Sequence, residues 1–218
     1  MNIKIIYLAL SIFFLSGGLC AQSFLGLHVG INSGKFSGDA PKDFIYKGKL
    51  LFNAGTVFDL KIKEDAFLSI APSYMISGSK LQYPHEINED ESEYRDSVDL
   101  KMQLFTIPII MKIISDNERF QFSGGFELSF PIKLIGDNSV EEIDLTNDIN
   151  NIAINMIFGI GYRIPIETSF LVINLAYSQG LTNLANNEVA YDSLLPRIRF
   201  TSFRLTTAWL LPLGKSKD

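Results

Sequence analysis

FQFSGGFELSFPIK, residues 120–133, alternates between two kinds of side chain. One set is apolar and mostly aromatic: Phe120, Phe122, Gly124, Phe126, Leu128, Phe130 and Ile132. The other set is small or polar: Gln121, Ser123, Gly125, Glu127, Ser129, Pro131 and Lys133. Successive side chains of a strand point to opposite faces, whereas a helix would spread these phenylalanines around its circumference. The stretch therefore predicts a β-strand with one aromatic face and one polar face.

The same period of two recurs in seven further segments of the chain. They are residues 25–32, 50–60, 68–77, 98–114, 151–164, 171–178 and 202–211. A tilted strand needs roughly 9–11 residues to cross a bilayer, and we expect each segment to be long enough. The chain therefore predicts eight strands, an even number, as bacterial outer-membrane barrels have.

The predicted connections alternate in length along the whole chain. Three are short, at residues 61–65, 115–119 and 165–168, and four are long, at residues 33–49, 80–97, 134–150 and 181–197. A soluble sandwich has no reason to keep this alternation, but outer-membrane barrels have short periplasmic turns and longer external loops. We therefore predict an all-β fold, an eight-stranded antiparallel up-and-down transmembrane β-barrel, with four longer external loops and the phenylalanines facing lipid.

Aromatic residues recur at two heights on the predicted lipid face. Those near the short turns are Phe58, Phe120, Tyr162 and Trp209, and those near the long loops are Tyr74, Phe130 and Tyr177. Outer-membrane barrels carry such girdles at both membrane interfaces. One observation argues against the predicted barrel. Pro72, Pro108 and Pro131 fall inside predicted strands, and a closed barrel has no edge where a missing N–H is harmless. Each proline must lie at a bulge or cost the ladder one hydrogen bond.

The first residues have the composition of a secretory signal peptide. Lys4 precedes the apolar run at residues 5–15, and small residues lead to a predicted cleavage after Ala21. Two alternatives are weaker: a lipid on Cys20 would need a small residue in place of Leu19, and the apolar run is shorter than the roughly 20 residues of a membrane helix. We predict a leader at residues 1–21, a barrel at 22–214 and a charged tail at 215–218.

The composition argues against several kinds of partner and site. The net charge of −5 argues against nucleic acid as a partner. Cys20 is the only cysteine, and His28 and His85 are the only histidines, so we predict no disulfide, no metal centre and no cofactor.

An eight-stranded barrel is just wide enough for side chains to fill it, so we expect no diffusion pore. Lys133 and six other charged or titratable residues fall on the predicted inner face. We expect those six, Glu127, Arg204, Lys112, Arg163, Asp59 and His28, to form one ion-pair network, since buried charges must be paired. A proton or ion path is the alternative use of these residues.

A lipid-modifying enzyme is a further alternative, with His28 beside Ser178 or Ser202. The chain has no Ser/His/acid spacing typical of a triad, so we predict no catalytic residue and no enzyme.

The second and third long loops are rich in acidic residues. Asp137, Glu141, Glu142 and Asp144 make a weak candidate for a cation site, although a calcium loop would need glycine at Glu142. The plainer interpretation is two solvated loops. The first long loop is basic instead, and Lys35, Lys42, Lys47 and Lys49 are candidates for contact with lipopolysaccharide phosphates.

Four segments together resemble the PorT-like outer-membrane β-barrel domain family of Gram-negative bacteria. They are LSIAPSYMISGSKL (68–81), LFTIPIIMKI (104–113), FGIGYRI (158–164) and LAYSQGLTNL (175–184). The resemblance covers most of residues 22–213 and implies the barrel fold, the outer-membrane location and tolerance of Pro72 and Pro108. The chain departs from the family at its end, which lacks the usual final aromatic residue unless Trp209 replaces it.

The resulting prediction is a non-enzymatic outer-membrane protein. Its role is structural or interactive, through its external loops or within an envelope complex, and its partners are outer-membrane lipid, lipopolysaccharide and other envelope proteins. A component of a protein secretion machinery is the alternative that the resemblance implies. A soluble exported barrel, with phenylalanines turned inward around an apolar ligand, is the second alternative.

Overall fold

The computed structural model describes residues 23–38, 45–82, 97–137, 142–186 and 198–213. The predicted leader and tail, with Lys42, His85 and Glu141, lie outside these residues. The elements in chain order are β1 (Ser23–Gly38), β2 (Ile45–Lys61), β3 (Ala66–Ile70), β4 (Ser73–Gln82), β5 (Ser97–Ile114), β6 (Phe120–Asp137), β7 (Glu142–Asp144), the 3-10 helix η1 (Thr146–Asp148), β8 (Ala153–Ile166), β9 (Ser169–Gly180) and β10 (Ile198–Leu213).

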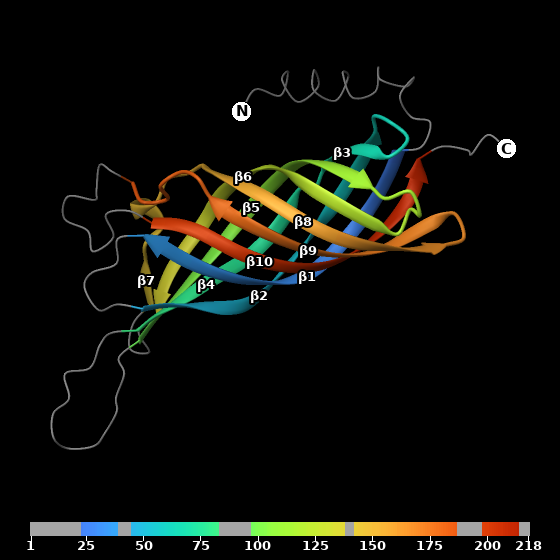
Figure 1. Ribbon diagram of the computed structural model, residues 1–218. Coiled ribbons are helices and arrows are strands. Elements are labelled where there is room, and N and C mark those ends of the chain that lie inside the picture. Colours follow the sequence, from blue (N-terminus) through green and yellow to red (C-terminus); the bar gives the residue numbers. More distant parts are fainter. Residues whose placement is uncertain (1–22, 39–44, 83–96, 138–141, 187–197, 214–218) are drawn as a thin grey trace.

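The strands close into a ring (Figure 1). All pairings are antiparallel, and β1 pairs with β10, from Ser23 opposite Leu213 to Gly38 opposite Ile198. β3 and β4 share one position between β2 and β5, and β7 pairs with β6 alone, so the described strands form eight positions. The predicted eight-stranded antiparallel barrel is confirmed.

The two faces of each strand differ in exposure as the alternation predicts. Phe126 is 57% exposed on the outside of the ring, whereas its neighbour Glu127 is 0% exposed on the inside. Other large apolar side chains, such as Leu27 and Leu50, are also exposed outside the ring. Soluble monomers rarely expose apolar surface of this extent. The alternative of a soluble barrel with inward phenylalanines is therefore wrong.

The short turns, at residues 62–65, 115–119 and 167–168, lie at the end of the barrel where β1 begins and β10 ends (Figure 1). The opposite end, where β1 ends and β2 begins, is called the long-loop end below. There the predicted boundaries are wrong, because β1 continues to Gly38, β2 begins at Ile45 and β6 continues to Asp137. Phe36 lies opposite Phe200 in this extension, with ring centroids 5.8 Å apart inside the barrel. The sheet thus continues into segments that were predicted as loops, and inward apolar pairs such as Phe36 and Phe200 pack there.

Pro72 and Pro108 lie at one shared interruption of the ladder. The predicted third strand is split there into β3 and β4, beside residues 71 and 72. Pro72 O accepts from Thr56 N at 3.0 Å, and Pro108 O accepts from Ala71 N at 3.2 Å. Neither proline can donate in return. Each therefore costs the sheet one hydrogen bond, and both losses fall in one place.

Pro131 lies at a bulge. Gln103 pairs with Lys133 and Leu104 pairs with Pro131, so Ile132 has no partner on β5. The extra residue reverses which side chains of β6 face inward. Leu134 is buried beyond the bulge, whereas Lys133 is exposed. The predicted inward position of Lys133 is therefore wrong.

Candidate functional site

An apolar cluster fills the interior at the long-loop end. Its buried members are Phe36, Met75, Leu100, Met102, Leu104, Leu134, Ile149, Ala153, Leu184, Ala185 and Phe200. Two connecting segments, residues 145–152 and 181–186, contribute side chains to this cluster. A β-bridge between Ile149 and Ala185 joins the two segments. The side chain of Asn150 fixes this bridge by donating to Asn183 O at 3.1 Å and Ala185 O at 3.0 Å. Side chains of the described residues thus occupy this end of the lumen.

Glu127 and Arg204 lie in contact below this cluster. Arg204 Nη1 donates to Glu127 Oε2 and Nη2 donates to Oε1, each at 2.5 Å, from β10 to β6 across the lumen. Asn155 Nδ2 and Ser178 Oγ also donate to Glu127 Oε1, at 3.0 and 3.3 Å. Ser202 Oγ accepts from Arg204 Nε at 3.3 Å. Bidentate pairing and three further hydrogen bonds compensate the two buried charges.

A second ion pair lies nearer the short turns. Lys112 Nζ on β5 donates to both carboxylate oxygens of Asp59 on β2, at 2.9 and 3.0 Å. Both side chains are buried. They reach each other across β3, which lies between β2 and β5.

Arg163 and His28 belong to neither pair. The Arg163 guanidinium lies 4.0 Å from the ring centroid of Phe170 and is flanked by Phe24 and Phe67, so aromatic faces hold it. His28 Nε2 lies 3.1 Å from Ser73 Oγ. The six expected lumen residues thus lie inside the barrel as two separate ion pairs and two isolated contacts, instead of one network. The order of the strands around the barrel decides which of these residues meet, and the alternation of the sequence does not reveal that order.

The geometry around His28 is unsuitable for a nucleophilic serine. Ser73 Oγ donates its single proton to Ala71 O at 2.8 Å, so the contact with His28 requires the histidine N–H as donor. A general base would have to accept that proton instead. Ser178 and Ser202, the serines considered from the sequence, bond to Glu127 and Arg204.

The aromatic residues expected to form the two girdles all lie on described strands. Phe120 and Tyr162 are opposite each other on β6 and β8, with ring centroids 5.2 Å apart. Trp209 is exposed on β10, and Phe58 is partly exposed on β2. Towards the other end, Tyr74 and Phe130 lie in one row on either side of Phe105, and Tyr177 lies opposite Phe203. Phe105 and Phe203 are outward aromatics that the sequence analysis did not single out.

Three of the candidate cation residues, Asp137, Glu142 and Asp144, lie in the described part of the chain, and they do not form a metal-binding group. Asp137 and Glu142 are cross-strand neighbours on β6 and β7, and both are exposed. Asp144 Oδ1 accepts from Thr146 Oγ1 and N, and these hydrogen bonds hold the pKa of Asp144 below its ordinary value. In the described part of the chain, no group of three or more His, Cys, Asp or Glu side chains is close enough to hold a metal ion. No helix there is both long and apolar enough to cross a membrane.

A family model described as "Outer membrane protein beta-barrel domain" matches residues 20–186, which is more than half of the chain. The chain belongs to this family. The protein is therefore an outer-membrane β-barrel, and its outward apolar side chains are the surface that lipid covers. No curated protein matches the chain.

Three solved structures are similar barrels. Ail, the attachment invasion locus protein of Yersinia pestis, shares 13% identity, with 87% of this chain and 99% of Ail covered and a TM-score of 0.47. Neisserial surface protein A shares 12% identity over 86% of this chain and 96% of its own, with a TM-score of 0.48. OprG from Pseudomonas aeruginosa shares 9% identity over 88% of this chain and 96% of its own, with a TM-score of 0.42.

Proposed function

We propose that this outer-membrane barrel is non-enzymatic and acts through its surface, as a structural or interaction protein that uses its external loops or joins an envelope complex. The observation that supports this proposal is the filled interior. The apolar cluster occupies one end of the lumen, and the Glu127–Arg204 pair crosses the barrel below it. A lumen filled in this way has no continuous aqueous path for solutes.

Planar bilayer recordings test the filled lumen. The purified protein is expected to produce no discrete conductance steps, because side chains occupy the cross-section. A diffusion porin reconstituted in the same way serves as the positive control. Reproducible single-channel steps from the refolded barrel would contradict the proposal.

Outer-leaflet lipid phosphate is the partner that the basic side chains of the strands favour. Basic side chains gather on the described strands at the long-loop end: Lys35, Lys47, Lys80, Lys101, Lys133 and Arg199. Lys47 lies directly opposite Lys80, a like-charge pair that destabilises a sheet unless an anion lies nearby. Asp99 also lies opposite Lys80, but Lys49 binds its Oδ2 at 2.9 Å. Lipopolysaccharide phosphates would supply the missing negative charge.

The double substitution Lys47→Gln/Lys80→Gln is expected to weaken lipopolysaccharide binding by about 2 kcal/mol, at about 1 kcal/mol for each lysine near an anionic lipid surface. Calorimetry with detergent-solubilised protein measures the change. The matched control is Lys61→Gln/Lys63→Gln at the short-turn end, which should bind like the wild type. Equal losses in both variants, or equal binding of dephosphorylated lipopolysaccharide by the wild type, would refute a phosphate site at this end.

The finer relationship to PorT-like barrels is also a proposal, and the four ordered motifs at residues 68–81, 104–113, 158–164 and 175–184 support it. A part in protein secretion, which some members of that family have, would be one form of membership in an envelope complex.

A further inference from the structure

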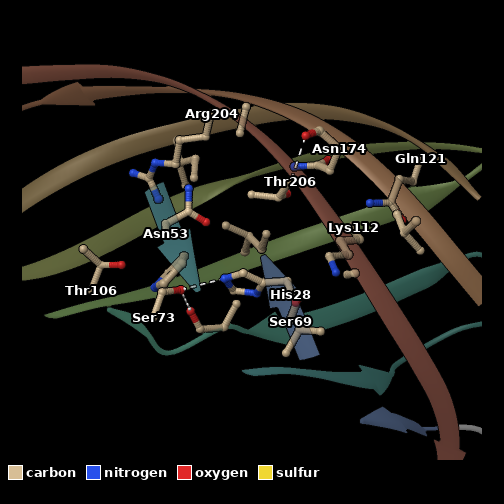
Figure 2. A pocket seen from close by; sticks show the side chains of 18 of the residues that line it. His28, Asn53, Ser69, Ser73, Thr106, Lys112, Gln121, Asn174, Arg204 and Thr206 are labelled. Carbon is tan, nitrogen blue, oxygen red and sulfur yellow. Dashed lines mark hydrogen bonds between the residues drawn. The ribbon is translucent and has the colours of Figure 1, made fainter. Parts of the chain in front are cut away.

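A chamber of about 90 Å³ lies inside the barrel, in the layer that contains His28 (Figure 2). Lys112 and Arg204, the cations of the two ion pairs, both line it. Polar side chains from several strands point into the same space, as Figure 2 shows for Asn53, Thr106 and Asn174. The filled lumen therefore contains a polar layer that side chains leave partly open.

Four buried polar atoms at the chamber have no hydrogen-bond partner within the protein. They are Asn53 Nδ2, Ser69 Oγ, Thr106 Oγ1 and Asn174 Oδ1. Ser69 and Thr106 are 0% exposed, and Asn53 is 4% exposed. Buried polar atoms in folded proteins are nearly always paired with protein or with ordered water, because an unpaired one is costly. The presence of four around one space indicates that the space is occupied.

We propose that the chamber is an internal hydration site that holds a small cluster of ordered water molecules. These waters hydrogen-bond to the four atoms and join β2, β3, β5 and β9, the strands that carry them. The proposal extends beyond the surface role, since it concerns what fills the lumen and does not depend on any partner.

The types of the four atoms select water over other occupants. Asn53 Nδ2 can only donate a hydrogen bond, and Asn174 Oδ1 can only accept one. An oxyanion only accepts, so it would leave Asn174 Oδ1 without a partner. A metal ion would be repelled by the positive charges of Lys112 and Arg204, which line the chamber. Water donates and accepts, and therefore matches the whole set.

A crystal structure of the detergent-solubilised protein, at a resolution where solvent is visible, tests the site directly. The expected result is separate solvent peaks within hydrogen-bond distance of all four atoms. Empty density in the chamber, or the density of a tetrahedral oxyanion, would overturn the proposal.

The direction in which one substitution shifts the folding equilibrium provides an independent test. Thr106→Val keeps the shape of the side chain and removes the hydroxyl. If water occupies the chamber, a hydrogen bond is lost, and the equilibrium constant for folding should fall about fivefold. If the chamber is dry, removal of an unpaired hydroxyl should leave that constant unchanged or raise it. Urea titration in micelles measures the change, gel heat-modifiability confirms folding, and Thr207→Val on the lipid face is the matched control.

Discussion

Glu127→Ala should destabilise the folded barrel by about 3–5 kcal/mol, the usual cost of removing one partner of a buried ion pair. The substitution leaves the Arg204 guanidinium buried with its two bidentate acceptors gone. It also removes the acceptor of Asn155 Nδ2 and Ser178 Oγ. Urea unfolding in detergent measures the loss, with Trp209, the only tryptophan, as the fluorescent reporter.

The double variant Glu127→Ala/Arg204→Ala separates pairing from simple loss of side-chain volume. Because it leaves no unpaired charge, it should cost less than the sum of the two single changes. Lys49→Ala is the surface control. It breaks the half-exposed pair with Asp99 and should cost no more than about 1 kcal/mol. A double-variant loss equal to the sum of the single losses would refute the coupling.

Phe126→Arg should destabilise the inserted barrel by about 2–4 kcal/mol, the cost of a cation on the lipid face near the bilayer midplane. Phe126 lies mid-strand on β6 and is exposed on the outside of the ring. Refolding and unfolding in lipid vesicles, followed by the gel shift of the folded form, measures this cost.

Two controls test the dependence on depth. Phe120→Arg, beside the 115–119 turn, should cost only about 0–1 kcal/mol, because the penalty falls near the interface. Phe126→Leu keeps an apolar side chain at the midplane and should be close to neutral. Equal costs for the two arginine variants would contradict the proposed position of β6 in the membrane.

The alternation was sufficient to predict eight strand positions and the opposite faces of Phe126 and Glu127. Phe126 and Glu127 differ in exposure because neighbouring strand residues point to opposite sides, and this rule needs no knowledge of strand partners. It fails where the backbone changes phase. The bulge at Ile132 exposes Lys133 and buries Leu134, and a run of alternating letters does not reveal an inserted residue.

The interior was less predictable because partners across the lumen depend on strand neighbourhood. Glu127 and Arg204 were both assigned to the inner face, which was sufficient to expect them in one ion-pair network. The Asp59–Lys112 pair depends on β2 and β5 lying on either side of β3. The aromatic surroundings of Arg163 were missed for a different reason. Phe24, Phe67 and Phe170 each precede a predicted strand by one residue, so no inward position was assigned to them.

A spin-label scan of residues 120–134 shows which face of β6 is turned towards lipid. Single cysteines are introduced into a chain that begins after Cys20, so that each label is unique, and oxygen accessibility is measured in lipid vesicles. The expected pattern is high accessibility at Phe122 and Phe126, low accessibility at Gln121 and Glu127, and a change of phase at Ile132 that leaves Leu134 protected. High accessibility at Gln121 and Glu127, or a profile without a period of two, would contradict the barrel orientation described for this chain.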